Sequence, residues 1–304
     1  MQPKVSIVIA SYNMAHLILE TIGSCMAQDY PNKEIIVYDD CSTDNTAHID
    51  WDVLGVKYVC GVKNGGVGYA FNEGIKHATG EIVIIMCADD LFLEKKYISD
   101  VVKCFNPRSR TTRKVGYVTR WYSQFIGNDM QPVRAWRGSN PVLLANNPSG
   151  LAFRKKALTG CECSGKMFIE SSQLAYQVLQ KGWEYRILRY DAIGARVHQS
   201  TSTRPEYWLK KRVSSPVMDW WNLGVKEITK DYVSFVQIKN GFKMSAVFEE
   251  IWNFVKLRPA NLITPAFWFW AIVAIVIPRG ILRKLPGFYR KYVGVKVTKA
   301  VKRK

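Results

Sequence analysis

Asp89 and Asp90 are adjacent carboxylates that directly follow the apolar run Glu81–Ala88. A short run rich in β-branched residues is typical of a strand buried on both faces of a parallel sheet, which places the two acids at its carboxyl end. Ligands of open α/β sheets bind outside the carboxyl ends of the strands, and carboxylate oxygens suit a divalent cation. The pair therefore predicts a site for a cation and a phosphorylated substrate. A solvated turn is the alternative, because aspartate is common where strands end.

A second acid pair, Asp39 and Asp40, follows another apolar run. Apolar residues recur at helical spacing from about Ala15 to Gln28, which indicates an amphipathic helix. Strands are predicted at Val5–Ala10, Glu34–Tyr38 and Val56–Val59. This alternation predicts an α/β fold with both acid pairs at the carboxyl edge of the sheet.

A glycine-rich segment, Lys63–Gly68, precedes a helix predicted to reach about Ala78. It matches neither GxGxxG nor a P-loop, so by itself it is weak evidence for a nucleotide-binding site. It still brings backbone N–H groups and a helix N-terminus to the edge that carries the acid pairs, where an anion is favoured.

The order of these motifs resembles the nucleotide-sugar-binding half of family-two glycosyltransferases, which are inverting enzymes of the GT-A fold. The segments that carry the resemblance are Val5–Asn13, Asp39–Asp44, Asn64–Gly74, Gly80–Glu81 and Ala88–Asp90. The resemblance covers residues 4–100 closely. It implies a Rossmann-like, mixed sheet flanked by helices, with a donor half at residues 1–100 and an acceptor half at 101–203.

The same resemblance implies roles for individual residues. Asp39 or Asp40 reads the nucleotide base, and Asp89 and Asp90 form a DXD-like site for the ribose and for Mn²⁺ or Mg²⁺. Cys87 is a departure, because many members have the first aspartate of that motif there, so the cation must rely on the other two acids. The donor pocket as a whole is implied to comprise Ala10, Ser11, Tyr12, Asp39, Asp40, Asn64, Gly66 and Asp89.

The acceptor half is less regular, with strands predicted at Val115–Ile126, Gln131–Trp136 and Leu151–Arg154. Its aromatic residues either stack on sugar faces or belong to the core, which is the commoner place for such side chains. They are Trp121, Tyr122, Trp136 and Trp183.

Phe168–Leu174 resembles the family's acceptor-activating helix start, where an acidic pair holds the general base. An inverting transfer needs that base because the acceptor hydroxyl must lose its proton during attack. Ser171 occupies the position of the usual aspartate and needs activation to act as a base, so Glu170 is the preferred residue. The alternative is a helix cap by Ser171 or Ser172 with Glu170 in solvent. His198 falls where the family often has a histidine that helps to hold the metal or the diphosphate.

The net charge of +18 is concentrated near the end of the sequence, because twelve Lys or Arg and no acidic residue follow Glu250. The apolar run Leu262–Ile277 would span about 24 Å as a helix, short of a hydrocarbon core of about 30 Å. An in-plane or re-entrant helix beside basic residues favours an anionic membrane surface over nucleic acid as the partner. A core helix followed by a disordered tail is the alternative. Residues 204–304 are therefore predicted to form a helical, basic, membrane-associating region.

Seven cysteines form no CxxC pair, which is typical of reduced intracellular thiols, and the N-terminus enters a strand with no room for a signal peptide. The expected location is the cytoplasmic face of a membrane. The expected function is inverting transfer of a sugar, from a UDP-sugar by resemblance, to a hydroxyl of a glycan or lipid-linked glycan. A non-catalytic nucleotide-sugar-binding or scaffolding protein is the alternative, because Cys87 and Ser171 replace usual acids.

Overall fold

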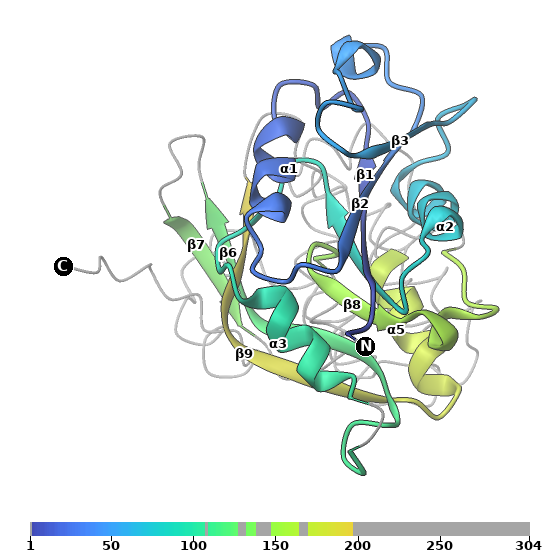
Figure 1. The fold of residues 1–304 in the computed structure, drawn as a ribbon, viewed down its shortest axis with the longest axis vertical. Helices are drawn as coiled ribbons and strands as arrows, with labels where there is room; N and C mark the ends of the chain where they lie inside the picture. Colours follow the sequence, from blue (N-terminus) through green and yellow to red (C-terminus); the bar gives the residue numbers. More distant parts are fainter. Residues whose placement is uncertain (1, 107–108, 127–131, 138–146, 164–169, 197–304) are drawn as a thin grey trace, which may run out of the picture. The chain divides into compact units, whose positions relative to one another are not determined.

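A central mixed sheet of nine strands organises the computed structural model, which describes residues 2–106, 109–126, 132–137, 147–163 and 170–196 (Figure 1). The strand order is β3-β2-β1-β4-β8-β6-β9-β5, and β7 pairs with β6 outside this path. The strands are β1 (Val5–Ser11), β2 (Lys33–Asp39), β3 (Lys57–Cys60), β4 (Ile82–Cys87), β5 (Leu91–Phe92), β6 (Val115–Ile126), β7 (Pro132–Arg137), β8 (Leu151–Arg154) and β9 (Glu184–Arg196).

The first four strands of that order, β3, β2, β1 and β4, are parallel to one another. Strand β8 then runs antiparallel to both β4 and β6, and β6 pairs with β9 in parallel. The donor half of the sheet is therefore an open parallel sheet, and the later strands extend it as a mixed one, as the sequence predicted.

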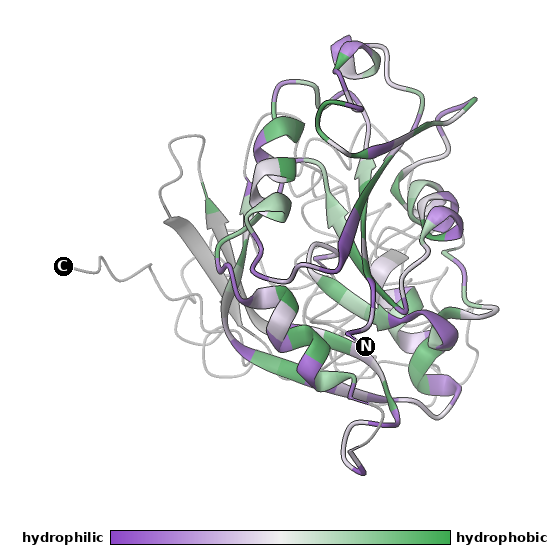
Figure 2. Cartoon of the chain, viewed as in Figure 1, coloured by the Kyte–Doolittle hydropathy of each residue, from purple (hydrophilic) through white to green (hydrophobic). Residues whose placement is uncertain are grey.

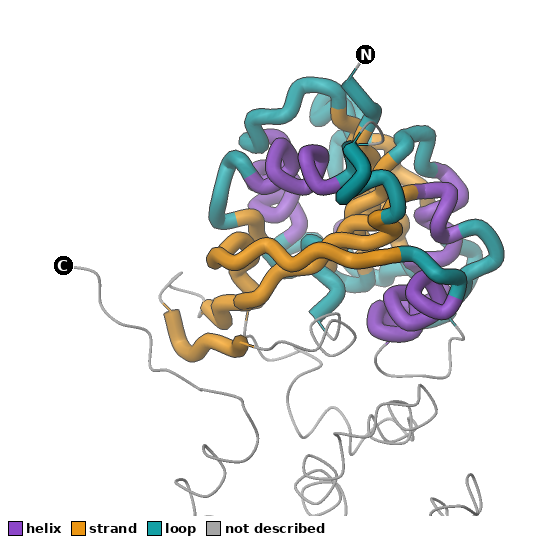
Figure 3. The backbone as a smooth tube through the Cα atoms, turned by 90° about the horizontal axis from the view of Figure 1, so that it is seen from below, coloured by secondary structure: helices purple, strands orange, loops and turns teal. Residues whose placement is uncertain are grey.

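Helices cover both faces of the sheet (Figure 3). They are α1 (Ile18–Met26), α2 (Val67–His77), α3 (Tyr97–Cys104) and α5 (Glu170–Gln180), with short 3₁₀ helices at Asn45–His48 and Lys155–Leu158. Side chains of β1, β2 and β4 pack alternately against α1 and α3 on one face and against α2 and α5 on the other. Figure 2 shows the resulting apolar colour on the central strands.

Strand β4 is buried on both faces, which confirms the interpretation of its apolar run. Ile84 and Met86 lie in the core beneath α1 and α3, whereas Val83 and Ile85 lie in the core beneath α2 and α5. Burial of each such side chain contributes about 1.5–3 kcal/mol relative to exposure. The polar residues that follow β4 are therefore held at the end of a rigid strand.

Helix α1 is shorter than the sequence predicted, because it begins at Ile18 and not near Ala15. The N–H of Ala15 donates to Asp44 Oδ2 at 2.9 Å, so this part of the chain is bound to the loop after β2. Asn13, with φ of 55°, turns the backbone into that contact. Helix α3 and strand β5 were not predicted.

In the described part of the chain, no helix is both long enough and apolar enough to cross a membrane. The predicted region 204–304, including Leu262–Ile277, lies outside the described residues.

Candidate active site

The strand register brings the polar residues after β1, β2 and β4 to one edge of the sheet. Ser11 of β1 is opposite Asp39 of β2, and Ala10 is opposite Cys87 of β4. Beyond the register, the N–H of Ala88 donates to the Ala10 carbonyl at 3.1 Å. The edge predicted from the sequence is therefore a continuous line of strand ends.

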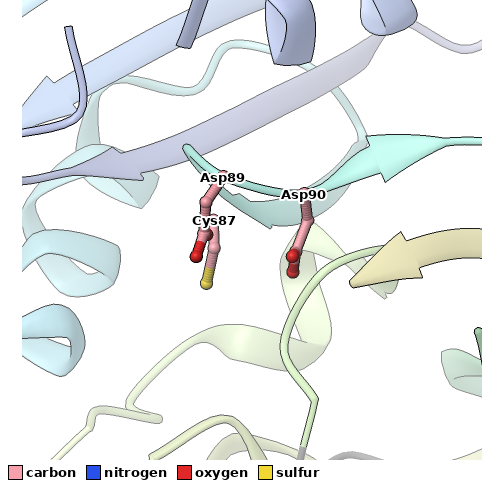
Figure 4. A group of neighbouring side chains, drawn as sticks. All are labelled: Cys87, Asp89 and Asp90. Carbon is pink, nitrogen blue, oxygen red and sulfur yellow. The ribbon is translucent and has the colours of Figure 1, made fainter. Parts of the chain in front are cut away.

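Cys87, Asp89 and Asp90 form a cluster after β4 (Figure 4). The sulfur of Cys87 and one carboxylate oxygen from each aspartate lie within 4.8 Å of one another. Figure 4 shows the three side chains extending to the same side of the backbone. Asp90 is buried, whereas Cys87 and Asp89 are half-buried, so the cluster has a closed base and an accessible rim.

Asp90 is fixed by two donors from distant parts of the sequence. Ser149 Oγ donates to its Oδ2 at 2.5 Å, and the backbone N–H of Arg196 donates to its Oδ1 at 3.0 Å. Burial, and then the charge of Asp89, nevertheless raise the pKa of Asp90 to about 8. A divalent cation between the carboxylates would remove this penalty on the charged form. Two hard oxygen donors held this close fit Mn²⁺ or Mg²⁺.

Three residues around the cluster were not singled out from the sequence. Ser149, which lies just before β8, also holds the end of β4, because its Oγ accepts from the N–H of Cys87 at 2.9 Å. Arg120 is buried in β6 and donates to the Asn147 carbonyl at 3.0 Å, which supports the loop before Ser149. Arg196 reaches Glu20 of α1 at 2.6 Å. The one signal for Arg120 was a charged residue in the middle of a strand pattern.

Asp39 and Asp40 are also buried, but both have donors from within the donor half. Asp39 accepts from the Ser42 hydroxyl and N–H at Oδ1 and from the Tyr58 hydroxyl at Oδ2, the last at 2.6 Å. Asp40 accepts from the N–H groups of Gly65 and Gly66 at 2.9 and 2.7 Å. The carboxylate of Asp40 therefore occupies the N-terminal end of α2, where the glycine segment was expected to favour an anion.

Ser11 Oγ has no hydrogen-bond partner among the described residues, although the residue is only 2 % exposed. A buried hydroxyl without a partner is costly in a folded protein, so a bound ligand that supplies one is favoured here. Tyr12, the next residue, is exposed, as is Asn64. Ala10 is buried.

The structure describes the predicted acceptor residues only in part. Glu170 is the first residue of α5, and Ser171 and Ser172 are buried in its first turn. Trp183 packs against the core on the α2 and α5 face, in agreement with the core alternative for this residue. His198 lies outside the described residues.

The sequence matches the profile described as Glycosyl transferase family 2 over residues 6–159, which is half of the chain. The chain belongs to glycosyl transferase family 2. The resemblance stated from the motifs is thus confirmed.

Relatives in this family match short segments. Poly-beta-1,6-N-acetyl-D-glucosamine synthase of Staphylococcus epidermidis is 40% identical over 88 residues, which are 28% of this chain and 21% of that protein. UDP-Glc:alpha-D-GlcNAc-diphosphoundecaprenol beta-1,3-glucosyltransferase of Escherichia coli is 35% identical over 104 residues, 32% of this chain and 39% of that protein. The matches therefore span well under half of either relative.

Solved structures of glycosyltransferases share the fold of this chain. The mannosyltransferase PcManGT from Pyrobaculum calidifontis, in complex with GDP-Man and Mn²⁺, has a TM-score of 0.55 at 17% identity, covering 90% of this chain and 84% of that one. S. aureus TarS with UDP-GlcNAc has a TM-score of 0.54 at 19% identity, covering 89% and 79%. The mixed α/β sheet is thus the GT-A architecture.

Proposed function

We propose that this glycosyltransferase moves a sugar from a UDP-sugar to a hydroxyl of a glycan or lipid-linked glycan, with inversion at the anomeric carbon. The observation that carries the proposal is the clustering of Cys87, Asp89 and Asp90 on the sheet edge that also carries Ser11 and Asp39. An edge with paired carboxylates and a buried hydroxyl without a partner suits a nucleoside diphosphate with a divalent cation.

Asp39, and not Asp40, is the residue proposed to read the base. Asp40 accepts from backbone N–H groups of the glycine segment, so this side chain is assigned to holding that loop at the start of α2. Asp39 is oriented by Ser42 and Tyr58 and lies beside Ser11, whose hydroxyl is available to the donor. The relatives with UDP-Glc and UDP-GlcNAc in their names support uridine as the base.

Asp89 and Asp90 would hold Mn²⁺ or Mg²⁺, with His198 as a further proposed ligand. When bound, the cation supplies positive charge to the diphosphate leaving group. Ser149 and Arg196 keep the Asp90 carboxylate in place.

Glu170 is the proposed general base for the acceptor. The acceptor oxygen forms a bond to the anomeric carbon while the bond from that carbon to the diphosphate oxygen breaks. The hydroxyl proton passes to the Glu170 carboxylate, and the electron pair of the broken bond leaves with the nucleoside diphosphate. Attack on the face opposite the diphosphate inverts the configuration. Support for Glu170 is its place at the start of α5 in a segment that resembles the family's acceptor-activating helix.

A lipid-linked acceptor at a membrane is supported by the E. coli relative, whose name gives an alpha-D-GlcNAc-diphosphoundecaprenol acceptor. The acid-free, basic segment after Glu250 supports an anionic membrane surface as a partner.

A two-step experiment tests the proposal. Melting of the full-length protein is followed with UDP-glucose, UDP-GlcNAc and GDP-mannose, each with and without Mn²⁺ or Mg²⁺, and a cation-dependent shift is expected with a UDP-sugar. That donor is then incubated with a diphosphoundecaprenol-linked sugar, and NMR gives the anomeric configuration of the product. A retained configuration would overturn the inverting mechanism, and sugar binding without transfer to any hydroxyl acceptor would favour the non-catalytic alternative.

Glu170→Gln should lower turnover by about two decades or more, with donor binding little changed, because a general base supplies a factor of this order. Glu162→Gln is the matched control, since Glu162 is exposed on the preceding segment. Full activity of Glu170→Gln would exclude Glu170 as the base.

A further inference from the structure

Cys87 stands within reach of the proposed cation. Its Sγ belongs to the same 4.8 Å cluster as the carboxylates of Asp89 and Asp90. In the part of the chain that the structure describes, this is the one group of three His, Cys, Asp or Glu side chains so close together. Figure 4 shows the sulfur beside the Asp89 carboxylate, with the Asp90 side chain extending in the same direction from the neighbouring backbone.

The spacing between Cys87 and Asp90 is set by a hydrogen-bond bridge. Ser149 Oγ accepts from the Cys87 N–H at 2.9 Å and donates to Asp90 Oδ2 at 2.5 Å. Cys87 also ends strand β4, whose five other residues are buried, so its backbone has little freedom. The residue as a whole is half-buried, as is Asp89 beside it.

Sulfur changes the chemistry of such a site. Carboxylate oxygens alone suit hard cations such as Mg²⁺, whereas a thiolate favours softer ones. A third ligand that is sulfur therefore biases the site away from Mg²⁺, toward Mn²⁺ and, more strongly, toward thiophilic ions such as Co²⁺ and Cd²⁺.

We propose that Cys87 is a sulfur ligand of the cation held by Asp89 and Asp90, and that it makes the site selective for softer divalent cations over Mg²⁺. This inference rests on the proposed function, because it requires a cation at the two aspartates. Binding through sulfur releases the thiol proton to the solvent. The alternative is that Cys87 only packs against the core on the α2 and α5 face.

Titration of the full-length, reduced protein with Co²⁺ tests the inference without any assay of activity. A sulfur ligand gives a thiolate-to-cobalt charge-transfer band in the near ultraviolet, which carboxylates do not give. The band is expected in the wild type and in Cys104→Ser, and it should be absent in Cys87→Ser. Cys104 is a matched control because it is also a half-buried free thiol, at the end of α3.

Selectivity is measured in the same titrations. Cys87→Asp should lower the ratio of Cd²⁺ to Mg²⁺ affinity by at least about tenfold. Replacing a residue that only contacts a metal ligand already changes metal affinity by about tenfold or more, so replacing a ligand should change it at least as much. A second measurement avoids substitution at Cys87: iodoacetamide alkylation of the wild type, followed by mass spectrometry, should be slowed by Cd²⁺ at Cys87 and not at Cys104.

The failures of the inference and of the proposed cation site are distinguishable. Co²⁺ binding that is lost in Asp90→Asn but shows no charge-transfer band, with alkylation of Cys87 unchanged, would overturn the sulfur ligand and leave the cation site standing. A band that persists in Cys87→Ser would overturn it as well. No binding of any divalent cation would overturn both.

Discussion

The two acid pairs of the donor half have the same sequence and both lie at the carboxyl end of a strand, yet they are held in different ways. Asp39 and Asp40 accept hydrogen bonds from loops of their own half of the chain, Ser42 and Tyr58 for the first and the glycine segment for the second. Asp90 accepts from Ser149 and Arg196, and its pKa is raised by burial and by Asp89.

The difference lies in how much charge remains uncompensated. The N–H groups of Gly65 and Gly66 and the end of helix α2 stabilise the Asp40 carboxylate, so the charge of Asp40 is compensated within the protein. The pair after β4 concentrates negative charge at a half-open rim and leaves it for a ligand. A carboxylate at a strand end therefore either holds a neighbouring loop or binds a ligand. Which of the two it does depends on the hydrogen-bond donors that the rest of the chain brings to it.

The largest effect on stability is expected from Asp40→Ala, which removes two charge-assisted hydrogen bonds from a buried site. The free energy of unfolding should fall by about 2–4 kcal/mol. Urea unfolding measures it, with Asp52→Ala as the control, because Asp52 is exposed and should change stability by less than about 0.5 kcal/mol. Equal effects of the two variants on stability would contradict the structural role of Asp40.

In the cation-free protein, Asp90→Asn is expected to change the free energy of unfolding in the opposite direction from Asp40→Ala. Its folded pKa of about 8 lies above the ordinary 3.8, so the folded protein holds a proton that the unfolded chain has lost between these two pH values. This contribution to stability is fully present below pH 3.8, falls as the pH rises, and is gone above about pH 8. With EDTA present, Asp90→Asn should lack this part of the pH dependence and be at least as stable as the wild type at pH 9. A clear destabilisation by Asp90→Asn at that pH would show that the carboxylate is already compensated.

A smaller effect is expected from Tyr58→Phe, which removes the 2.6 Å hydrogen bond to Asp39 Oδ2. Stability should fall by about 1–2 kcal/mol. If Asp39 reads the base, the KM for the UDP-sugar should rise while kcat stays nearly constant. Tyr69→Phe is a matched control, since Tyr69 is a half-buried tyrosine on α2. An unchanged KM in Tyr58→Phe would argue against base reading by an oriented Asp39.

The smallest effect on the donor half is expected from removal of the chain from Asn261 onward. The truncated protein should bind the UDP-sugar as before, because both acid pairs precede Asp100. It should no longer pellet with anionic vesicles, since the apolar run and the basic residues are gone. If the full-length protein ignores such vesicles, or if truncation unfolds the donor half, the membrane interpretation is wrong.

The sequence was sufficient for features that depend on neighbours in the chain. The runs ending at Ala10, Tyr38 and Cys87 showed buried strands, and the acids after them were placed correctly at the sheet edge. It was insufficient where distant segments meet. Ser149 and Arg196 approach Asp90 from 59 and 106 residues away, through the antiparallel insertion of β8 and through β9.

Local patterns also misplaced the start of α1, because the bond from the Ala15 N–H to Asp44 joins two loops whose contact no periodicity reveals. The different roles of Asp40 and Asp90 could not be predicted from the sequence for the same reason. Asp40 differs from Asp90 only in which backbone and hydroxyl donors reach it in the folded protein.

Binding of Mn²⁺ at saturating UDP, followed by the electron paramagnetic resonance signal of free Mn²⁺, tests the division between the pairs most directly. The wild type and Asp40→Asn, each held below its melting temperature, should lower the signal of free Mn²⁺ below the level that UDP alone gives, whereas Asp90→Asn should leave it at that level. Binding by Asp90→Asn equal to that of the wild type, or loss of binding in folded Asp40→Asn alone, would contradict the account.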